Sequence, residues 1–190
     1  MDLAGWDEQY RKEACSATAR EPVPNPLLIE AARDVRPGRA LDLACGTGRN
    51  ALWLAEHGWN VTAVDGSDAA MEILQSRARD AGVTINAQTV DLEEPAFAIE
   101  PARYDLIAMC YYFQRNLIEQ CRQGLVPGGV IVAIALLIEP GKEHSTFRLQ
   151  PGELRGFFAD WDVLHYREGT DVWQHKVAEL VSLRPALANM

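Results

Sequence analysis

The stretch LDLACGTGRN, residues Leu41–Asn50, decides the fold of this 190-residue chain. An apolar strand expected at Arg39–Ala44 leads into a turn that contains Gly46 and Gly48, and a helix is expected at Asn50–His57. Glycine permits the positive φ of a tight turn and the close approach of a ligand to the backbone. The first turn of a helix also leaves backbone N–H groups without partners inside the helix. A strand, a glycine-rich turn and a helix in this order predict the ligand-binding turn of a βαβ unit.

Apolar strands and helices alternate along the rest of the chain. Further strands are expected at Val61–Val64, Thr84–Val90, Tyr104–Cys110, Val130–Leu137, Trp161–Arg167 and Lys176–Leu183. Helices are expected at Pro26–Val35, Ser67–Gly82, Gln114–Gly124 and Pro151–Phe158, with a turn at Pro127–Gly129. This alternation predicts an α/β fold with a doubly wound, Rossmann-like, mainly parallel sheet of seven strands. The last two strands have no helix between them, so they are expected to form a C-terminal antiparallel hairpin.

The composition narrows the classes of protein. With 48% hydrophobic and 24% charged residues, the chain is expected to fold as one globular domain, residues 1–190. Residues 1–36 form an N-terminal extension, residues 37–137 the expected ligand-binding core, and residues 138–190 the remaining loop and hairpin. A net charge of −9 argues against nucleic acid and anionic membrane surfaces as partners.

The cysteines and the N-terminus indicate a compartment. Cys15, Cys45, Cys110 and Cys121 form no C-x-x-C pair, so the sequence predicts neither a metal site nor a disulfide framework. The first residues are charged and lack the apolar segment of a signal peptide. The longest apolar run, Val130–Ile138, is nine residues and too short to span a membrane. These features predict a cytoplasmic protein.

Asp65 extends the pattern of the glycine turn. It lies nineteen residues after Gly46, at the end of the next expected strand. A carboxylate at this place binds the ribose hydroxyls of a nucleoside cofactor. Gly46, Gly48 and Ala51 also satisfy a loose dinucleotide fingerprint, so these residues alone leave a nicotinamide cofactor open.

Asp42 distinguishes between the possible cofactors. It lies four residues before Gly46, where a carboxylate would repel a pyrophosphate and attract an ammonium group. S-adenosylmethionine carries an amino-acid head, a sulfonium and an adenosine, and it has no phosphate. Asp42 near its amine, Asp65 on its ribose and Asp91–Leu92 at its adenine form a consistent set. The sequence therefore predicts S-adenosylmethionine as the cofactor.

Several stretches together resemble one class of enzyme. Leu41–Gly48 resembles motif I of class I S-adenosylmethionine-dependent methyltransferases, Val64–Ser67 their ribose-binding acidic loop, and Val90–Leu92 their adenine loop. Tyr104–Ile107 and Pro127–Gly129 resemble the fourth and fifth strands of the same fold. The resemblance implies a Rossmann-like methyltransferase fold.

A narrower resemblance is to the tellurite-resistance (TehB-like) and related small thiol methyltransferases, through Pro37–Ala55 and Pro151–Trp161. Trp6 and Tyr10 resemble an aromatic pair that covers the cofactor in many such enzymes, which makes residues 1–36 an expected helical lid. The resemblance implies methyl transfer to a small molecule, such as a thiol or a metalloid oxyanion, with S-adenosylhomocysteine as the product. The residues expected to contact the cofactor are Trp6, Tyr10, Asp42, Ala44, Gly46, Thr47, Gly48, Asn50, Asp65, Gly66, Ser67, Asp91, Leu92 and Cys110.

Few residues are candidates for the acceptor side. Tyr111 follows the fourth strand, His144 lies in the loop after the fifth, and His175 precedes the last. Arg148, in the same loop as His144, either holds an anionic acceptor or faces solvent. A general base is needed only for an acceptor that carries a proton at neutral pH. The shortage of bases favours a soft or already anionic acceptor.

Three functions remain open on the sequence. The first is methyl transfer to a small molecule, and the second is nicotinamide-dependent oxidation or reduction. The third is binding of S-adenosylmethionine without catalysis, with an effect through partner molecules. A monomer and a homodimer both remain possible.

Overall fold

The computed structural model describes residues 3–14, 23–95, 97–139, 141 and 145–186 of the chain. These residues belong to two compact units, a first unit at Met1–Ala98 and a second unit at Ile99–Met190. His144, one of the candidate residues, lies outside the described ranges. In the part of the chain that is described, no helix is both long enough and apolar enough to cross a membrane.

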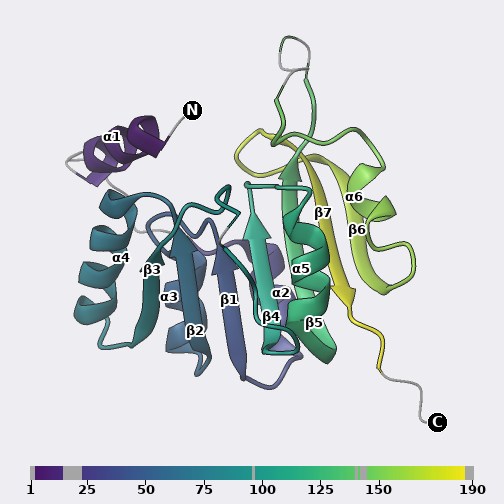
Figure 1. Cartoon of the computed structure of the whole chain (residues 1–190), viewed down its shortest axis with the longest axis horizontal. Helices are drawn as coiled ribbons and strands as arrows, with labels where there is room; N and C mark the ends of the chain where they lie inside the picture. Colours follow the sequence, from purple (N-terminus) through teal and green to yellow (C-terminus); the bar gives the residue numbers. More distant parts are fainter. Residues whose placement is uncertain (1–2, 15–22, 96, 140, 142–144, 187–190) are drawn as a thin grey trace. The chain divides into compact units, whose positions relative to one another are not determined.

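Three parallel strands form the sheet of the first unit (Figure 1). They are β1 (Arg39–Leu43), β2 (Asn60–Asp65) and β3 (Ile85–Thr89), in the order β3-β2-β1. Its helices are α1 (Leu3–Ala14), α2 (Pro26–Arg33), α3 (Arg49–Glu56) and α4 (Asp68–Asp80). Because β1 and β2 are parallel, with Leu43 opposite Val64, their carboxyl ends share one edge of the sheet.

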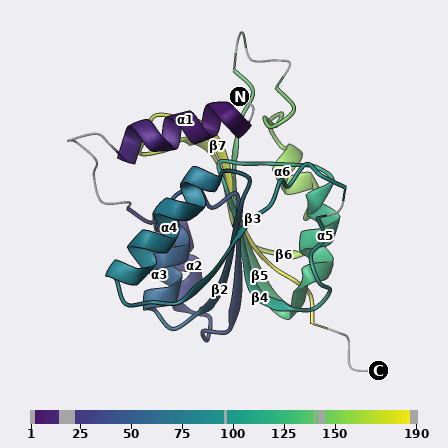
Figure 2. The same ribbon diagram turned by 60° about the vertical axis from the view of Figure 1, so that its left-hand side comes forward.

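Local sequence signals explain where these helices begin and end. Asn25 caps α2 by accepting a hydrogen bond from Leu27 N, and Ser67 caps α4 by accepting one from Ala70 N. Gly58, at a φ of 86°, follows the end of α3 in the left-handed conformation. Figure 2 shows α3 and α4 on the same side of the strands of this unit.

The second unit contains four strands among its described residues, in the order β4-β5-β7-β6. They are β4 (Tyr104–Cys110), β5 (Leu125–Leu136), β6 (Asp162–Thr170) and β7 (Lys176–Leu183). β4 and β5 are parallel, whereas β7 pairs antiparallel with both β5 and β6. The expected C-terminal hairpin is therefore present. The helices of the unit are α5 (Leu117–Gly124) and α6 (Glu153–Gly156).

The predicted turn at Pro127–Gly129 is wrong, because β5 begins at Leu125 and runs through these residues. The pairing register with β4 shifts between Tyr104 and Leu106, so the extra residues of β5 form a bulge. Gly128, at a φ of 79°, donates its N–H to Arg184 O. Proline and glycine thus mark an irregular strand here rather than its start.

The two helices of the second unit are shorter than predicted. α5 begins at Leu117 instead of Gln114, and the turn before it is closed by Leu117 N donating to Gln114 O. α6 covers only Glu153–Gly156 of the expected Pro151–Phe158. Gly152 precedes it at a φ of 82°, a left-handed conformation that lies outside the helix.

Candidate functional site

Asp42, on β1, is a buried carboxylate that the chain only partly satisfies. Its exposed fraction is 1%, and it accepts a backbone hydrogen bond from Ala51. Its Oδ2 has no hydrogen-bond partner among the described residues. Burial raises the pKa of Asp42 to about 7, against the opposing effects of the Arg49 charge and the Ala51 N–H. A buried carboxylate oxygen without a donor is costly, so this place suits a cation or donor that comes from outside the chain.

Asp65, at the end of β2, joins two segments. One is the loop at residues 64–67, called the ribose loop here after its expected role, and the other is the glycine turn. Its Oδ2 accepts a hydrogen bond from Gly46 N at 2.8 Å, and its Oδ1 accepts one from Ser67 N at 2.9 Å. Burial raises the pKa of Asp65, against the N–H donors of Ser67, Gly46 and Gly66. These three donors leave about one of the four lone-pair sites of the carboxylate for a ligand hydroxyl.

The glycine turn has a conformation that other residues would strain. Ala44, Gly46 and Gly48 have φ values of 51°, 54° and 85°. A Cβ atom on Gly48 would lie 2.1 Å from Leu74 Cδ1 of α4, which explains why glycine is needed at this position. The turn is also tied to α4 by Arg77, whose Nη1 donates to Thr47 O at 3.0 Å.

Helix α1 approaches this turn through one aromatic face. Trp6 and Tyr10 stack with ring centroids 5.8 Å apart, which confirms that they share a helix face. A Cβ atom on Gly46 would lie 2.9 Å from Tyr10 Oη, so the phenol sits directly over the glycine turn.

A second set of contacts joins α1 to the ribose loop. Asp7 Oδ1 accepts hydrogen bonds from Ser67 Oγ and, at 3.3 Å, from Ala69 N at the start of α4. A Cβ atom on Gly66 would lie 2.5 Å from Leu3 Cδ2. Figure 1 shows α1 lying across the end of α4. The structure thus brings α1, the glycine turn and the ribose loop together.

Three other predicted cofactor contacts are partly engaged with the chain itself. Asn50 is buried, and its Oδ1 accepts a hydrogen bond from Asn25 N at 2.9 Å. Asp91 Oδ1 accepts a hydrogen bond from Glu93 N at 2.9 Å. Leu92, the next residue in the sequence, is buried. Asn50 therefore positions α2 against α3, and Asp91 shapes the loop after β3.

In the second unit, Tyr111 and the β6–β7 turn form a polar and aromatic cluster. Tyr111 Oη donates to Asp171 Oδ2 at 2.9 Å. The Tyr111 ring lies edge-on to Trp173 and to His175, with centroid distances of 5.8 and 5.9 Å. Tyr111 has a φ of 65°, a conformation that costs a non-glycine residue about 1–3 kcal/mol. The structure thus brings Tyr111 and His175, both predicted candidates, next to the same carboxylate.

Asp171 was not predicted from the sequence. Its exposed fraction is 7%, and its Oδ1 accepts hydrogen bonds from Trp173 N at 2.9 Å and His175 N at 2.8 Å. Its Oδ2 lies 3.4 Å from His175 Nδ1. Burial acts to raise the pKa of Asp171, but the donors from His175, Tyr111 and Trp173 outweigh it and hold the pKa below its usual value. The only signal for Asp171 in the sequence is an aspartate at a turn. The sequence does not show its contact with Tyr111, which lies sixty residues away.

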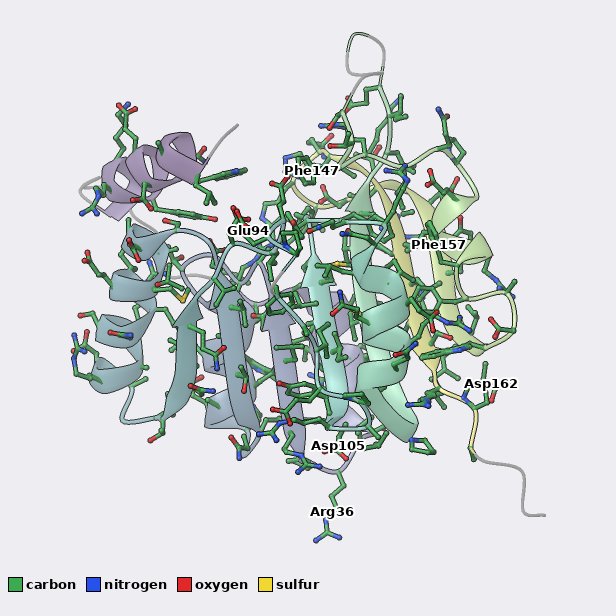
Figure 3. All side chains as sticks on the ribbon, viewed as in Figure 1. Arg36, Glu94, Asp105, Phe147, Phe157 and Asp162 are labelled. Carbon is green, nitrogen blue, oxygen red and sulfur yellow. The ribbon has the colours of Figure 1, made fainter. Side chains whose placement is uncertain are left out.

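The loop after β5 gives a different outcome for Arg148. The Arg148 side chain is only 13% exposed, so it does not face solvent, and its Nη1 donates to Leu137 O at 2.6 Å and to Glu139 Oε1 at 2.7 Å. Phe147 packs on Tyr112 at 5.5 Å between ring centroids. Figure 3 shows Phe147 at the end of the second unit that carries this loop. Cys110, a predicted cofactor contact, is buried at the end of β4.

These observations define a class of protein. The first unit has parallel strands that end in a glycine turn and an acidic ribose loop. The second unit ends in the antiparallel order β5-β7-β6. These are elements of the Rossmann-like fold that class I S-adenosylmethionine-dependent methyltransferases share.

The comparisons with known proteins agree and name a family. The family model of the tellurite resistance protein TehB matches residues 10–180. The chain therefore belongs to the TehB family, as the resemblance predicted. Its fold matches the crystal structure of TehB from Haemophilus influenzae with a TM-score of 0.74 and 23% identity, over 94% of this chain and 67% of that one. The predicted α/β, Rossmann-like fold class is confirmed.

Two curated relatives match 74% of the chain. Hemagglutinin 1 of Eikenella corrodens is 31% identical over 151 residues, which are 49% of its length. The probable S-adenosyl-L-methionine-dependent methyltransferase TehB of Haemophilus influenzae (strain Rd) is 25% identical over 151 residues, which are 52% of its length. The chain thus spans about half the length of the curated relatives it matches.

Proposed function

We propose that this chain binds S-adenosylmethionine through its first unit and transfers the methyl group to a small-molecule nucleophile. The observation that carries the proposal is the buried Oδ2 of Asp42, which has no hydrogen-bond partner among the residues that the structure describes. A carboxylate there suits the ammonium group of the methionyl part and disfavours a pyrophosphate. This is also the reason to prefer S-adenosylmethionine over a nicotinamide dinucleotide.

The other predicted residues take roles that follow from their positions in the first unit. Asp65 accepts hydrogen bonds from the ribose hydroxyls, with its orientation fixed by Gly46 N and Ser67 N. The backbone of the glycine turn, from Ala44 through Thr47 to Gly48, lies against the methionyl part. Gly66 lies in the ribose-binding loop beside Asp65, and Asp91–Leu92 hold the adenine, with Leu92 against the ring.

Helix α1 is the proposed cover of the bound cofactor. Trp6 and Tyr10 present one aromatic face, and the Tyr10 hydroxyl already lies over Gly46. Aromatic rings favour a neighbouring cation such as a sulfonium. Asp7, bonded to Ser67, fixes the position of this helix over the ribose loop. The carbonyl of Cys110, at the end of β4, is proposed as a further cofactor contact.

When bound, the cofactor supplies a methyl group that is already activated for transfer. The chain then contributes mainly by holding the acceptor in line, and such positioning can lower a barrier by several kcal/mol. The proposed acceptor is a soft nucleophile, either a thiol or a metalloid oxyanion, in a cytoplasmic protein that acts without nucleic acid.

A panel assay tests the proposal. The chain is incubated with S-adenosylmethionine labelled in its methyl group and, separately, with thiols, metalloid oxyanions and amines. Labelled methyl on at least one acceptor is expected, together with calorimetric binding of S-adenosylhomocysteine. Binding of NAD(H) without binding of S-adenosylhomocysteine would favour the nicotinamide alternative. Binding of S-adenosylhomocysteine without transfer to any acceptor would favour a non-catalytic cofactor-binding protein.

A further inference from the structure

The cluster around Asp171 lies where acceptor chemistry is expected. Tyr111 directly follows β4, and ligands of α/β sheets bind beyond the carboxyl ends of the strands. Asp171 and His175 come from the turn between β6 and β7. The Tyr111 backbone holds its unusual φ through a hydrogen bond from its N–H to Ile134 O at 2.7 Å. The chain therefore orders an aromatic hydroxyl directly after β4, in a backbone conformation that needs support.

The direction of the Tyr111 hydrogen bond gives this hydroxyl a chemical role. Its proton points to Asp171 Oδ2 at 2.9 Å, so the oxygen is the end of the hydroxyl that accepts from a donor. Asp171 stays ionised because Trp173 N, His175 N and Tyr111 Oη all donate to it. A hydroxyl that donates to a fixed anion is a better hydrogen-bond acceptor than an ordinary phenol.

His175 completes a path to solvent. Its Nδ1 lies 3.4 Å from Asp171 Oδ2, and its side chain is 54% exposed. Its ring lies edge-on to Tyr111, with 5.9 Å between the centroids. Arg167, which binds Glu179 at 2.9 Å, also interacts electrostatically with Asp171. A proton that reaches Asp171 can therefore pass to an imidazole that is in contact with bulk water.

We propose that Tyr111, Asp171 and His175 form a proton relay, and that the methyl acceptor is a nucleophile that arrives with its proton, such as a thiol. This inference rests on the proposed function and narrows its acceptor class. Tyr111 is the catalytic residue, because it touches the acceptor, and Asp171 is a positioning residue that acts through Tyr111.

The step balances in atoms and electrons. The acceptor's S–H proton passes to Tyr111 Oη while the Tyr111 proton passes to Asp171 and on to His175, which releases it to solvent. The electron pair left on the acceptor sulfur forms the new bond to the methyl carbon. The bond between that carbon and the sulfonium breaks, and its electrons stay on the departing sulfur. A metalloid oxyanion, which is already deprotonated, would not need the relay.

The test compares two thiols that differ in acidity. An alkanethiol carries its proton at pH 7, whereas 4-nitrothiophenol is ionised at that pH. Tyr111→Phe removes only the hydroxyl, and Asp171→Asn removes the charge while its Oδ1 can still accept from Trp173 N and His175 N. Asp162→Asn is the matched control, because it makes the same change at the exposed start of β6. Figure 3 shows Asp162 at the opposite end of the second unit from Phe147.

Both relay variants are expected to lower kcat/KM for the alkanethiol by about 100-fold. They are expected to leave 4-nitrothiophenolate turnover and S-adenosylhomocysteine affinity unchanged, as the control leaves all three quantities unchanged. A second readout needs no turnover: the affinity of the alkanethiol for the complex of the chain with S-adenosylhomocysteine. This affinity is expected to fall in Tyr111→Phe and to stay unchanged in Asp162→Asn.

Three results would overturn the relay. The first is an equal loss of kcat/KM for both thiols in the relay variants, which would mean that the cluster is only structural. The second is an unchanged kcat/KM for both thiols. The third is a wild-type chain that methylates metalloid oxyanions and no thiol, which overturns the relay and leaves the proposed function standing. Absence of methyl transfer to every acceptor would instead contradict the proposed function itself.

Discussion

Asp42 in the first unit and Asp171 in the second are both buried aspartates, yet the chain treats them in opposite ways. Asp171 receives hydrogen bonds from two backbone N–H groups and a phenol, and its pKa is lowered. Asp42 has an oxygen with no partner among the described residues, and burial raises its pKa to about 7. The described part of the chain satisfies Asp171 fully, whereas it leaves Asp42 with an oxygen that the proposed ligand would satisfy.

This difference separates an anion that the chain itself stabilises from a candidate binding site. Burying a carboxylate without enough donors costs free energy that folding must supply. A cationic ligand that contacts Asp42 would supply the missing interaction. The site would therefore bind a cation more tightly than a neutral or anionic ligand. Asp171 needs no ligand to stay ionised, which suits a role in orienting Tyr111.

The largest expected effect comes from Asp42→Asn. It should weaken S-adenosylhomocysteine binding by about 2–5 kcal/mol, because the ligand ammonium loses a buried partner. The same variant should make the unliganded chain more stable at pH 8, because a buried charge is removed. Calorimetric titration and thermal unfolding measure the two quantities. Loss of both affinity and stability would indicate a structural role for Asp42 instead.

The pH dependence of stability sharpens the contrast. Because the folded pKa of Asp42, about 7, lies above its usual value of 3.8, this group's contribution to stability is fully present below pH 4. That contribution is lost as the pH rises through 7. The stability difference between Asp42→Asn and the wild type should therefore grow between pH 4 and pH 8. Urea unfolding at several pH values measures it, and a difference that does not change with pH would contradict the raised pKa.

Proton release on binding is the matching expectation for the liganded state. A ligand ammonium favours the ionised form of Asp42, so binding near pH 6.5 should release up to one proton from the wild type. Calorimetry in buffers of different ionisation enthalpy measures this number. Asp42→Asn should remove the release, and an unchanged value in that variant would place the titrating group elsewhere.

A smaller effect is expected for Asp65→Ala. Cofactor affinity should fall by about 1–3 kcal/mol, because charged hydrogen bonds to the ribose are lost. Stability should fall as well, unlike in Asp42→Asn, since Gly46 N and Ser67 N lose their acceptor. The free energy of unfolding should thus rise in Asp42→Asn and fall in Asp65→Ala, and these opposite signs distinguish the two carboxylates. Unchanged affinity in Asp65→Ala would mean that the ribose site is misplaced.

The smallest effect is expected for Asp7→Asn. Asp7 fixes α1 on the ribose loop, but Asn keeps an oxygen that can accept from Ser67 Oγ and Ala69 N. Cofactor affinity should fall by less than in Asp65→Ala, with a faster dissociation rate as helix α1 is held less firmly. Stopped-flow displacement of S-adenosylhomocysteine measures this rate. A loss larger than that of Asp65→Ala would make α1, and not the ribose loop, the main determinant of affinity.

The sequence predicted the first unit well because its signals are local. Gly46, Gly48 and Asp65 act within a few residues of a strand end, and each conformation follows from its own stretch. The turn at Pro127–Gly129 was wrong because a bulge and a turn use the same residue types. The bulge is held by Arg184, which lies far along the chain.

The cluster of the second unit could be predicted only in part for a similar reason. Tyr111 and His175 were candidates by position, but the residue that joins them, Asp171, contacts Tyr111 across sixty positions. The expectation of an already anionic acceptor came from the shortage of bases in the sequence. It did not include the contact between Tyr111 and Asp171, because a single sequence does not show that contact. Pairings between distant residues arise from the sheet register of β5, β6 and β7, and a single sequence does not contain that register.

In the proposed site, Asp42 pairs with the amine of S-adenosylmethionine. The most direct measurement is a calorimetric cycle that combines the wild type and Asp42→Asn with S-adenosylhomocysteine and its analogue that lacks the amino group. The substitution is expected to weaken S-adenosylhomocysteine binding strongly and to leave binding of the analogue nearly unchanged. An equal loss for both ligands, or binding of NAD(H) in place of S-adenosylhomocysteine, would contradict it.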